Sequence, residues 1–282
     1  MSKLKKALER AKKNSTAFPA STSEESDSSQ STSLRRLDSE KKASLRPESR
    51  IDFSQTKIQP VSHHRLRKNK IFALFSKTEI NDRFKTLRVQ VLRKLEKLGT
   101  NSVMVTSANP GDGKSFTSIN LGVSIAQELD RTVLIVDADL KNPAKKHYDF
   151  AKDFFNVDVH LGLADVLTGK AELNEALINP GIEKLTILPG GTYLHNSAEL
   201  IGSPKMEYLV QELKERYKDR VVIFDTPAIL ACADPVALSK FVETVLFVVE
   251  EEKTTSEDVK QAMALLSDVQ IIGMILNKSK NK

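Results

Sequence analysis

Two glycines, a lysine and a serine lie close together in the stretch Ala108–Ser115, which reads ANPGDGKS. This spacing matches the phosphate-binding loop (P-loop) pattern, with alanine in the place of the first glycine. Gly111 and Gly113 allow backbone N–H groups to converge on a phosphate chain, and Lys114 reaches the β- and γ-phosphates as a positive charge. Ser115 supplies a hydroxyl ligand for Mg²⁺. The pattern predicts a nucleotide site; a glycine-rich turn without a ligand is the plain alternative.

Three aspartates follow two other apolar stretches. Asp137 and Asp139 close VLIVDAD, and Asp225 closes VVIFD. Mg²⁺ prefers hard oxygen ligands and keeps most of its waters, so carboxylates at neighbouring strand ends can hold those waters or polarise a nucleophile. A single aspartate of this kind is better explained as a helix N-cap or a turn residue. Three of them beside a P-loop predict a nucleotide–metal site.

The elements that must position these residues alternate along the chain. Nearly all-apolar runs of strand length begin at residues 102, 132, 185, 221, 244 and 271. Amphipathic runs at 115–129, 205–217 and 255–267 lie between them, and a further helix is expected from about residue 77 to 98. This alternation predicts an α/β fold, with a doubly wound, mostly parallel sheet and helices on both faces. Ligands of such sheets bind at the carboxyl ends of the strands.

The beginning of the chain differs in composition from the rest. Residues 1–70 hold 17 Lys and Arg against 8 Asp and Glu, a net +9 within a total of +6, which leaves −3 for the remainder. Residues 14–50 are Ser-rich with little to bury, and residues 2–13 favour a short helix. We therefore divide the chain into a basic, largely disordered arm at 1–76 and a folded domain at 77–282. Residues 51–76 leave open whether IDFSQTKIQPV packs on the domain.

Composition also limits the compartment and the partners. One cysteine, Cys232, excludes an intrachain disulfide and suits a reducing cytoplasm. No apolar run approaches the roughly 18–20 residues of a membrane span, and MSKLKKALERAKK lacks the apolar core of a signal peptide. The basic arm can contact an acidic membrane surface, nucleic acid or a protein, and a solvated arm with no ligand is an equal alternative.

The three polar stretches resemble a known family. TSANPGDGKS, VLIVDADLKNP and VVIFDTPAIL are similar to the Walker A, Walker A′ and Walker B motifs of bacterial protein-tyrosine kinases, which regulate capsule and exopolysaccharide export. The resemblance runs from about Asp82 to Asn277. It implies a P-loop NTPase fold, ATP and Mg²⁺ as cofactors, and a protein tyrosine as substrate. It further implies a cytoplasmic protein at the inner face of the membrane, with a membrane-bound activator of the chain-length-determinant type and no nucleic acid.

The resemblance assigns a role to each site residue. It implies catalytic roles for Lys114, Asp137 and Asp139, and metal-binding roles for Ser115, Asp137 and Asp225. Asn277, at the end of the last strand, is expected to face the adenine; an ordinary strand-end turn residue is the alternative. The cofactor-binding set is Gly111, Asp112, Gly113, Lys114, Ser115, Phe116 and Asn277.

Two other functions stay open. A nucleotide-dependent switch of the MinD/ParA kind shares the fold and binds membrane or DNA. That group carries an extra lysine near the start of its P-loop, where this chain has Asn109, so the sequence disfavours it. The third reading is a non-catalytic ATP-binding regulator of a polysaccharide-export complex.

The chain departs from the family pattern in several places. Lys141 stands where the family often has arginine. The E-x-x-R-x-x-R motif used in ring assembly is replaced by Asp82, Lys85 and Arg88, which leaves a homo-oligomer in doubt. Typical members end in a cluster of tyrosines, whereas this sequence ends ILNKSKNK. Tyr208 and Tyr217 lie on a helical run, whereas Tyr148 and Tyr193 lie in loop-like contexts. We expect Tyr148 and Tyr193 to be the better phosphate acceptors.

Overall fold

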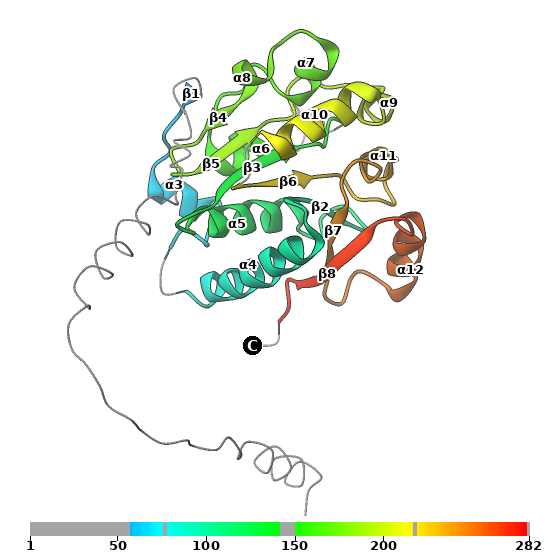
Figure 1. The fold of residues 1–282 in the computed structure, drawn as a ribbon. Coiled ribbons are helices and arrows are strands. Elements are labelled where there is room, and N and C mark those ends of the chain that lie inside the picture. Colours follow the sequence, from blue (N-terminus) through cyan, green and yellow to red (C-terminus); the bar gives the residue numbers. More distant parts are fainter. Residues whose placement is uncertain (1–56, 76–77, 142–149, 217–218, 281–282) are drawn as a thin grey trace, which may run out of the picture. The chain divides into compact units, whose positions relative to one another are not determined.

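A computed structural model gives the fold of the chain, and it describes residues 57–75, 78–141, 150–216 and 219–280. In these ranges the strands form one eight-stranded sheet in the order β1-β4-β5-β3-β6-β2-β7-β8 (Figure 1). Neighbouring strands run parallel, except β4 and β5, which are antiparallel. The strands are β1 (Lys57–Ile58), β2 (Ser102–Ser107), β3 (Thr132–Asp137), β4 (Ile178–Asn179), β5 (Leu185–Leu188), β6 (Arg220–Asp225), β7 (Thr244–Glu250) and β8 (Gln270–Asn277). The predicted doubly wound, mostly parallel sheet is confirmed.

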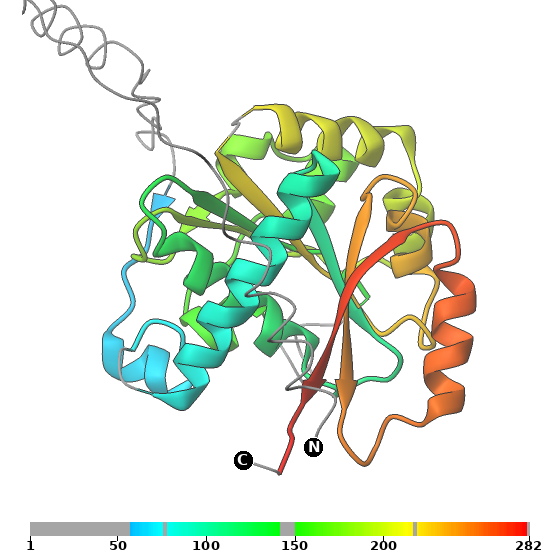
Figure 2. The ribbon, with the colours of Figure 1, turned by 60° about the horizontal axis from the view of Figure 1, so that its bottom comes forward.

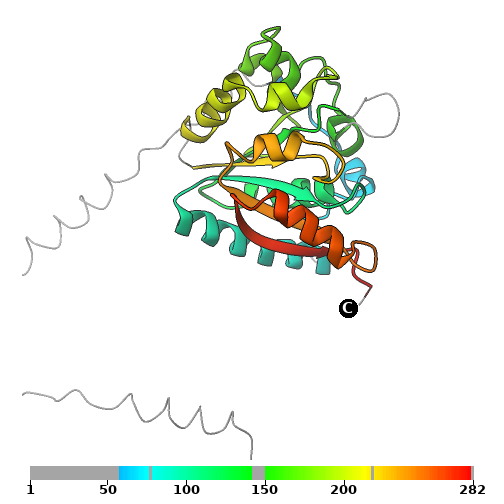
Figure 3. The same ribbon diagram turned by 90° about the vertical axis from the view of Figure 1, so that its right-hand side faces the viewer.

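Helices cover both faces of the sheet. On one face lie α3 (His63–Lys68), α4 (Glu79–Leu98), α5 (Lys114–Ala126) and α6 (Phe150–Phe155). On the other face lie α7 (Leu163–Thr168), α8 (Leu173–Ala176), α9 (Ser197–Ile201), α10 (Pro204–Glu215), α11 (Asp234–Leu238) and α12 (Ser256–Leu265). Figure 2 shows α4 lying across the face that α5 also covers, and Figure 3 shows β8 and α12 together at one edge.

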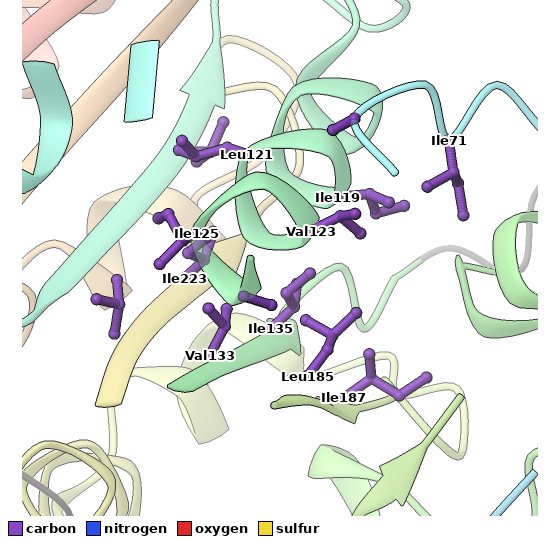
Figure 4. Close-up of a cluster of buried hydrophobic side chains, with 14 of the residues drawn as sticks. Ile71, Ile119, Leu121, Val123, Ile125, Val133, Ile135, Leu185, Ile187 and Ile223 are labelled. Atoms are coloured by element: carbon purple, nitrogen blue, oxygen red, sulfur yellow. The ribbon is translucent and has the colours of Figure 1, made fainter. Parts of the chain in front are cut away.

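The central strands are almost entirely buried because each contributes side chains to both layers. In β2, Val103 and Val105 point into the cluster beneath α4 and α5, whereas Met104 points into the opposite cluster. This is the period-two alternation of a strand with two buried faces. Figure 4 shows one cluster, in which Ile119 and Val123 of α5 pack near Ile135 of β3. The packing fixes α5, and therefore the loop that precedes it, against the centre of the sheet.

Helix α4 shows how local sequence sets the bounds of an element. Thr78 caps its first turn, with its Oγ1 accepting a hydrogen bond from the Asn81 backbone N–H at 3.2 Å. Gly99 ends it in the left-handed conformation at φ 68°. Phe84, Val91 and Leu95 are buried, as their spacing predicts. The helix therefore begins and ends close to the expected residues.

The compact unit that contains the sheet begins before the boundary expected at residue 76. Residues 57–75 belong to the compact unit that contains the sheet, because β1 pairs with β4 and α3 packs on α6. Leu66, Ile71 and Ala73 are at most 1% exposed. The sequence pattern assigned this segment to the arm because the three buried apolar residues lie among many charged ones.

No helix within the described ranges is long and apolar enough to cross a membrane.

Candidate active site

Strand order brings the three predicted polar stretches to one place. Strand β6 lies between β3 and β2, so the loops that follow these three strands meet at the same edge of the sheet. Asp137 and Asp225 are direct register partners on β3 and β6, and Asp225 is also paired with Val105 of β2. Neighbouring strands in a sheet lie about 4.8 Å apart, so the two carboxylates are held as neighbours.

The P-loop takes the backbone shape that its two glycines permit. Gly111 and Gly113 have φ of 88° and 98°, in the left-handed region that side chains disfavour. Gly113 is the N-cap of α5, so Lys114 and Ser115 begin the helix and its free N–H groups face the loop. A helix N-terminus preceded by such a turn is a phosphate-binding arrangement.

Two side chains brace the outer part of the loop. Asp112 is fully buried, and its Oδ2 accepts a hydrogen bond from the Asn109 backbone N–H at 3.1 Å. The side-chain amide of Asn109 donates to Asp258 Oδ2 of α12 at 3.0 Å. Asp112 thus uses its carboxylate on the loop itself.

Two residues at the end of β8 donate hydrogen bonds to backbone carbonyls of the P-loop. The Asn277 Nδ2 donates to the Asp112 carbonyl at 2.8 Å, and a Cβ on Gly113 would lie only 1.9 Å from that nitrogen. The Lys278 Nζ donates to the Gly111 carbonyl at 2.8 Å. The close approach explains why position 113 requires glycine, and it commits one hydrogen-bonding group of Asn277 to the loop backbone.

Asp225 is a buried carboxylate with serine partners. Its Oδ1 accepts a hydrogen bond from Ser118 Oγ at 2.8 Å. Burial raises the Asp225 pKa to about 6, against the lowering effects of a hydrogen bond from Ser115 and the Lys114 charge. The sequence reasoning missed Ser118; its place four residues after Lys114, on the same face of α5, was the available signal.

Asp137 lies in a similar environment. Burial raises its pKa well above the usual range, and the charges of Asp225 and Asp139 raise it further. Its Oδ1 accepts a hydrogen bond from the Asp139 backbone N–H at 3.1 Å. Gly190, in the loop after β5, passes so close that a Cβ there would lie 3.1 Å from Asp137 Oδ2. Two neighbouring acids that repel each other, one buried and one half-buried, favour a bound cation between or beside them.

Six of the ten predicted site residues border one cleft of about 710 Å³, whereas Asp112, Asp137, Asp225 and Asn277 do not line it. Its polar wall comprises Gly111, Gly113, Lys114, Ser115, Asp139 and Lys141, and its apolar wall comprises Pro110, Phe116, Phe154, Pro227, Ala228, Ala231 and Cys232. A second groove, of about 530 Å³, shares Phe116 with the cleft. Phe84, Leu87 and Asn277 also line this groove. Residues from all three polar stretches therefore line the same cleft.

The donor set fits magnesium bound together with a phosphate chain. Within the described residues, no group of three or more His, Cys, Asp and Glu is placed to hold a metal by itself. The oxygen donors that are available, the Ser115 hydroxyl and the carboxylates of Asp137 and Asp225, are of the hard type that Mg²⁺ prefers. Mg²⁺ usually takes few protein ligands and completes its shell with phosphate oxygens and water, which matches this incomplete set.

Of the four candidate acceptor tyrosines, the structure describes one in a loop and one on a helix. Tyr193 lies in the loop after β5 with 40% of its surface exposed, and its ring packs edge-on against His195 at 4.9 Å between centroids. The next residue, Leu194, donates its backbone N–H to the Leu140 carbonyl beside the cleft at 3.1 Å. Tyr208 is 70% exposed on α10. Tyr148 and Tyr217 lie outside the described residues.

Comparisons with known proteins agree with this geometry. Residues 100–279 match the family model described as AAA domain. The chain is 33% identical over 218 residues to the tyrosine-protein kinase YwqD of Bacillus subtilis (strain 168), covering 77% of this chain and 88% of that protein. The kinase domain of the Escherichia coli tyrosine kinase ETK superposes with a TM-score of 0.66 at 26% identity, covering 80% of this chain and 92% of that domain.

A more distant structural neighbour carries a nucleotide. The septum site-determining protein MinD from Pyrococcus horikoshii OT3, complexed with Mg-ADP, superposes with a TM-score of 0.52 at 28% identity, over 64% of this chain and 72% of that one. The chain therefore has a nucleotide-binding fold.

Proposed function

Because the chain belongs to the family of bacterial tyrosine-protein kinases, we propose that its cleft binds Mg²⁺–ATP and transfers the γ-phosphoryl group to protein tyrosines. The observation that carries the proposal is the meeting of Lys114 and Ser115 with the carboxylates of Asp137, Asp139 and Asp225 at one sheet edge. Phosphoryl transfer needs positioning and charge neutralisation more than covalent chemistry, and these residues supply both.

The P-loop and its neighbours hold the nucleotide in this proposal. Backbone N–H groups around Gly111–Ser115 and the Lys114 ammonium bind the phosphates. Ser115, Asp225 and Asp137 hold Mg²⁺, partly through its waters. The second groove, beside Phe116, has the apolar lining that suits a purine ring. When bound, Mg²⁺–ATP supplies the transferable phosphoryl group.

The opposite part of the cleft receives the acceptor. Asp139 lines the cleft and would take the proton of the tyrosine hydroxyl. The tyrosine oxygen then forms the new P–O bond while the bond between the γ-phosphorus and the β,γ-bridging oxygen breaks, and ADP leaves. Phe154 and Pro227 form part of an apolar wall against which a phenol ring packs. Lys141 adds positive charge where the transferred group becomes more negative.

The cellular role follows from the motif resemblance. We propose that the enzyme regulates capsule or exopolysaccharide production from the inner face of the cell membrane. A chain-length-determinant-type membrane protein would activate it, and the basic N-terminal arm would assist recruitment. Electrostatic attachment of this kind weakens with salt, because exposed charges are screened beyond about 8 Å at physiological ionic strength.

Any self-association through α4 would have fewer free charged side chains available than the three predicted positions suggest. Lys85 Nζ and Asp82 Oδ1 form an exposed pair at 2.9 Å on α4. Arg88 is used within the chain, because its Nε lies 2.7 Å from Glu128 Oε1 and its Nη1 donates to the Ser124 carbonyl. We therefore propose that any contact between copies through this helix uses Asp82 and Lys85 rather than Arg88.

The test is phosphotyrosine formation from ATP. Purified full-length protein is incubated with Mg²⁺ and γ-labelled ATP, with and without a candidate membrane activator, and phosphotyrosine is detected on either protein. Lys114→Met should lower transfer by at least about 100-fold, since it removes a positioned positive charge from the phosphates. Lys240→Met, at an exposed lysine of the same charge, is the matched control and should keep wild-type activity. Wild-type transfer in the Lys114→Met variant would refute the assignment.

A nucleotide-dependent switch is the second candidate. The structural similarity to MinD favours it, and Asn109 in place of the signature lysine argues against it. Steady ADP formation without phosphotyrosine on any protein, with the activator present, would support the switch. Nucleotide binding without either product would support the non-catalytic regulator.

A further inference from the structure

Lys141 enters the cleft from the loop that follows β3, where it is held by a carboxylate from a distant part of the chain. Its Nζ lies 3.4 Å from Asp234 Oδ1, and its side chain is 38% exposed. Asp234 is the first residue of α11, and its side chain is fully buried. The Asp234 charge is the largest influence on the Lys141 pKa, which it raises, so that the ammonium stays charged at physiological pH.

Asp234 is itself fixed by a third residue. Ser197, the first residue of α9, is fully buried and donates its hydroxyl to Asp234 Oδ2 at 2.6 Å. Helices α9 and α11 pack against each other on the same face of the sheet (Figure 1). One carboxylate oxygen therefore faces the serine and the other faces the lysine, which leaves the carboxylate a single well-defined orientation.

The physical need for this support comes from the side chain at position 141. Lysine carries a compact charge on a flexible four-carbon stem, and it lacks the planar fork with which arginine fixes its own geometry. A half-exposed lysine otherwise samples many rotamers, most of which point its ammonium away from a phosphate. A buried carboxylate that is locked by a serine selects the rotamers whose ammonium stays at the cleft.

We propose that Asp234 is a positioning residue that holds the Lys141 ammonium over the cleft, and that Ser197 fixes Asp234 for this task. The proposal rests on the proposed function, because Lys141 acts on the transferred phosphoryl group. Asp234 and Ser197 do not line the cleft, so both act through Lys141 and not on the substrate. Glu199 and Cys232 also face the ammonium and contribute smaller electrostatic effects.

The experiment is a double-mutant cycle on the full-length chain. ADP formation and Mg-ADP affinity are measured for the wild type, Asp234→Asn, Lys141→Met and the double variant. Asp234→Asn should lower kcat about tenfold, within the range that a misplaced catalytic group costs, while the Kd for Mg-ADP changes less than about threefold. In the Lys141→Met background the same change should have no further effect on kcat beyond about twofold.

Further variants separate positioning from a structural role. Ser197→Ala should lower kcat by about threefold, because it removes one hydrogen bond and leaves the ion pair. Lys141→Arg should keep most of the wild-type kcat, since the guanidinium restores the pair with Asp234. Asp268→Asn, at an exposed aspartate before β8, is the matched control and should change nothing.

Three outcomes would overturn the proposal. They are wild-type kcat in Asp234→Asn, an undiminished loss when Asp234→Asn is added to Lys141→Met, or a loss of melting temperature that accounts for the whole effect in both Asp234→Asn and Ser197→Ala. The proposed function is tested separately by wild-type phosphotyrosine formation. An enzyme that forms ADP but no phosphotyrosine would refute the kinase assignment while the cycle still reports on Lys141.

Discussion

At the residue scale, the main feature is that carboxylates are removed from solvent at the place where a bound cation needs negative charge. Asp225 is buried, its register partner Asp137 is half-buried beside it, and burial raises the pKa of both carboxyls. Such sites are unfavourable for folding and favourable for binding a metal, because the bound cation removes the repulsion that burial creates. The carboxylates therefore connect stability with function.

We predict that Asp225→Asn stabilises the nucleotide-free protein at neutral pH. The folded-state pKa of about 6 lies above the usual 3.8, so the native state keeps a proton that the unfolded state has released. This contribution to stability is therefore lost as pH rises from about 4 to 6, and it stays lost above pH 6. Asparagine cannot ionise, and its effect should be on the order of 3 kcal/mol at pH 7.

The measurement is urea unfolding of both proteins at about pH 5 and pH 7.5 without Mg²⁺ or nucleotide. The wild type should lose more stability between the two pH values than the variant. Conversely, the variant should bind Mg-ADP more weakly at pH 7.5. Equal pH dependence in the two proteins would show that Asp225 does not titrate in this range.

At the element scale, β8 supports the P-loop from behind. Asn277 donates a hydrogen bond to the Asp112 carbonyl of the loop. It also lines the groove of about 530 Å³ that is proposed to hold the purine ring. We predict that Asn277→Ala weakens ATP and GTP binding alike, by about tenfold, because the loss of one buried hydrogen bond loosens the loop for every nucleotide. Isothermal titration with both nucleotides tests this. A loss confined to ATP would instead assign Asn277 to reading adenine.

The loop after β5 and helix α10 present tyrosines in different ways. Tyr208 belongs to an ordered helix, which would have to unwind to enter a neighbouring cleft, whereas Tyr193 lies in a loop. We predict that autophosphorylation is weak and falls on Tyr193 in preference to Tyr208. Mass spectrometry after incubation with Mg²⁺–ATP locates the phosphate, and Tyr193→Phe should remove it while Tyr208→Phe keeps it. A dominant phosphate on Tyr208 would contradict this account.

At the scale of the whole molecule, the folded body begins before the first amphipathic helix. Leu66 and Ile71 are buried, and burial of one such side chain contributes about 1.5–3 kcal/mol. We predict that a chain of residues 53–282 melts like the full-length protein, whereas a chain of residues 77–282 melts at least several degrees lower. Differential scanning calorimetry of the three proteins decides this. Equal melting temperatures for the two truncated chains would show that residues 57–75 add no stability.

Local patterns in the sequence determined six of the eight strands, the major helices and the three motifs, and they missed β1 and β4. The all-apolar runs, the alternation with amphipathic runs and the ANPGDGKS turn each reflect interactions within a few residues, and they predicted the sheet and its carboxyl-end site. Local patterns left the packing of residues 57–75 open, because β1 has only two residues and Leu66, the buried residue of α3, lies among charged neighbours.

Only the tertiary structure decided which distant groups meet. Ser118 contacts Asp225 across 107 positions and Asn277 contacts the P-loop across 165. Asp234 pairs with Lys141 although the strands β4, β5 and β6 lie between them in the sequence. Such pairs depend on strand order and helix packing, which are set by the burial of apolar surface over the whole domain and not by any local spacing. The motifs therefore locate the chemistry, and the packing of β8, α9 and α11 determines which side chains support it.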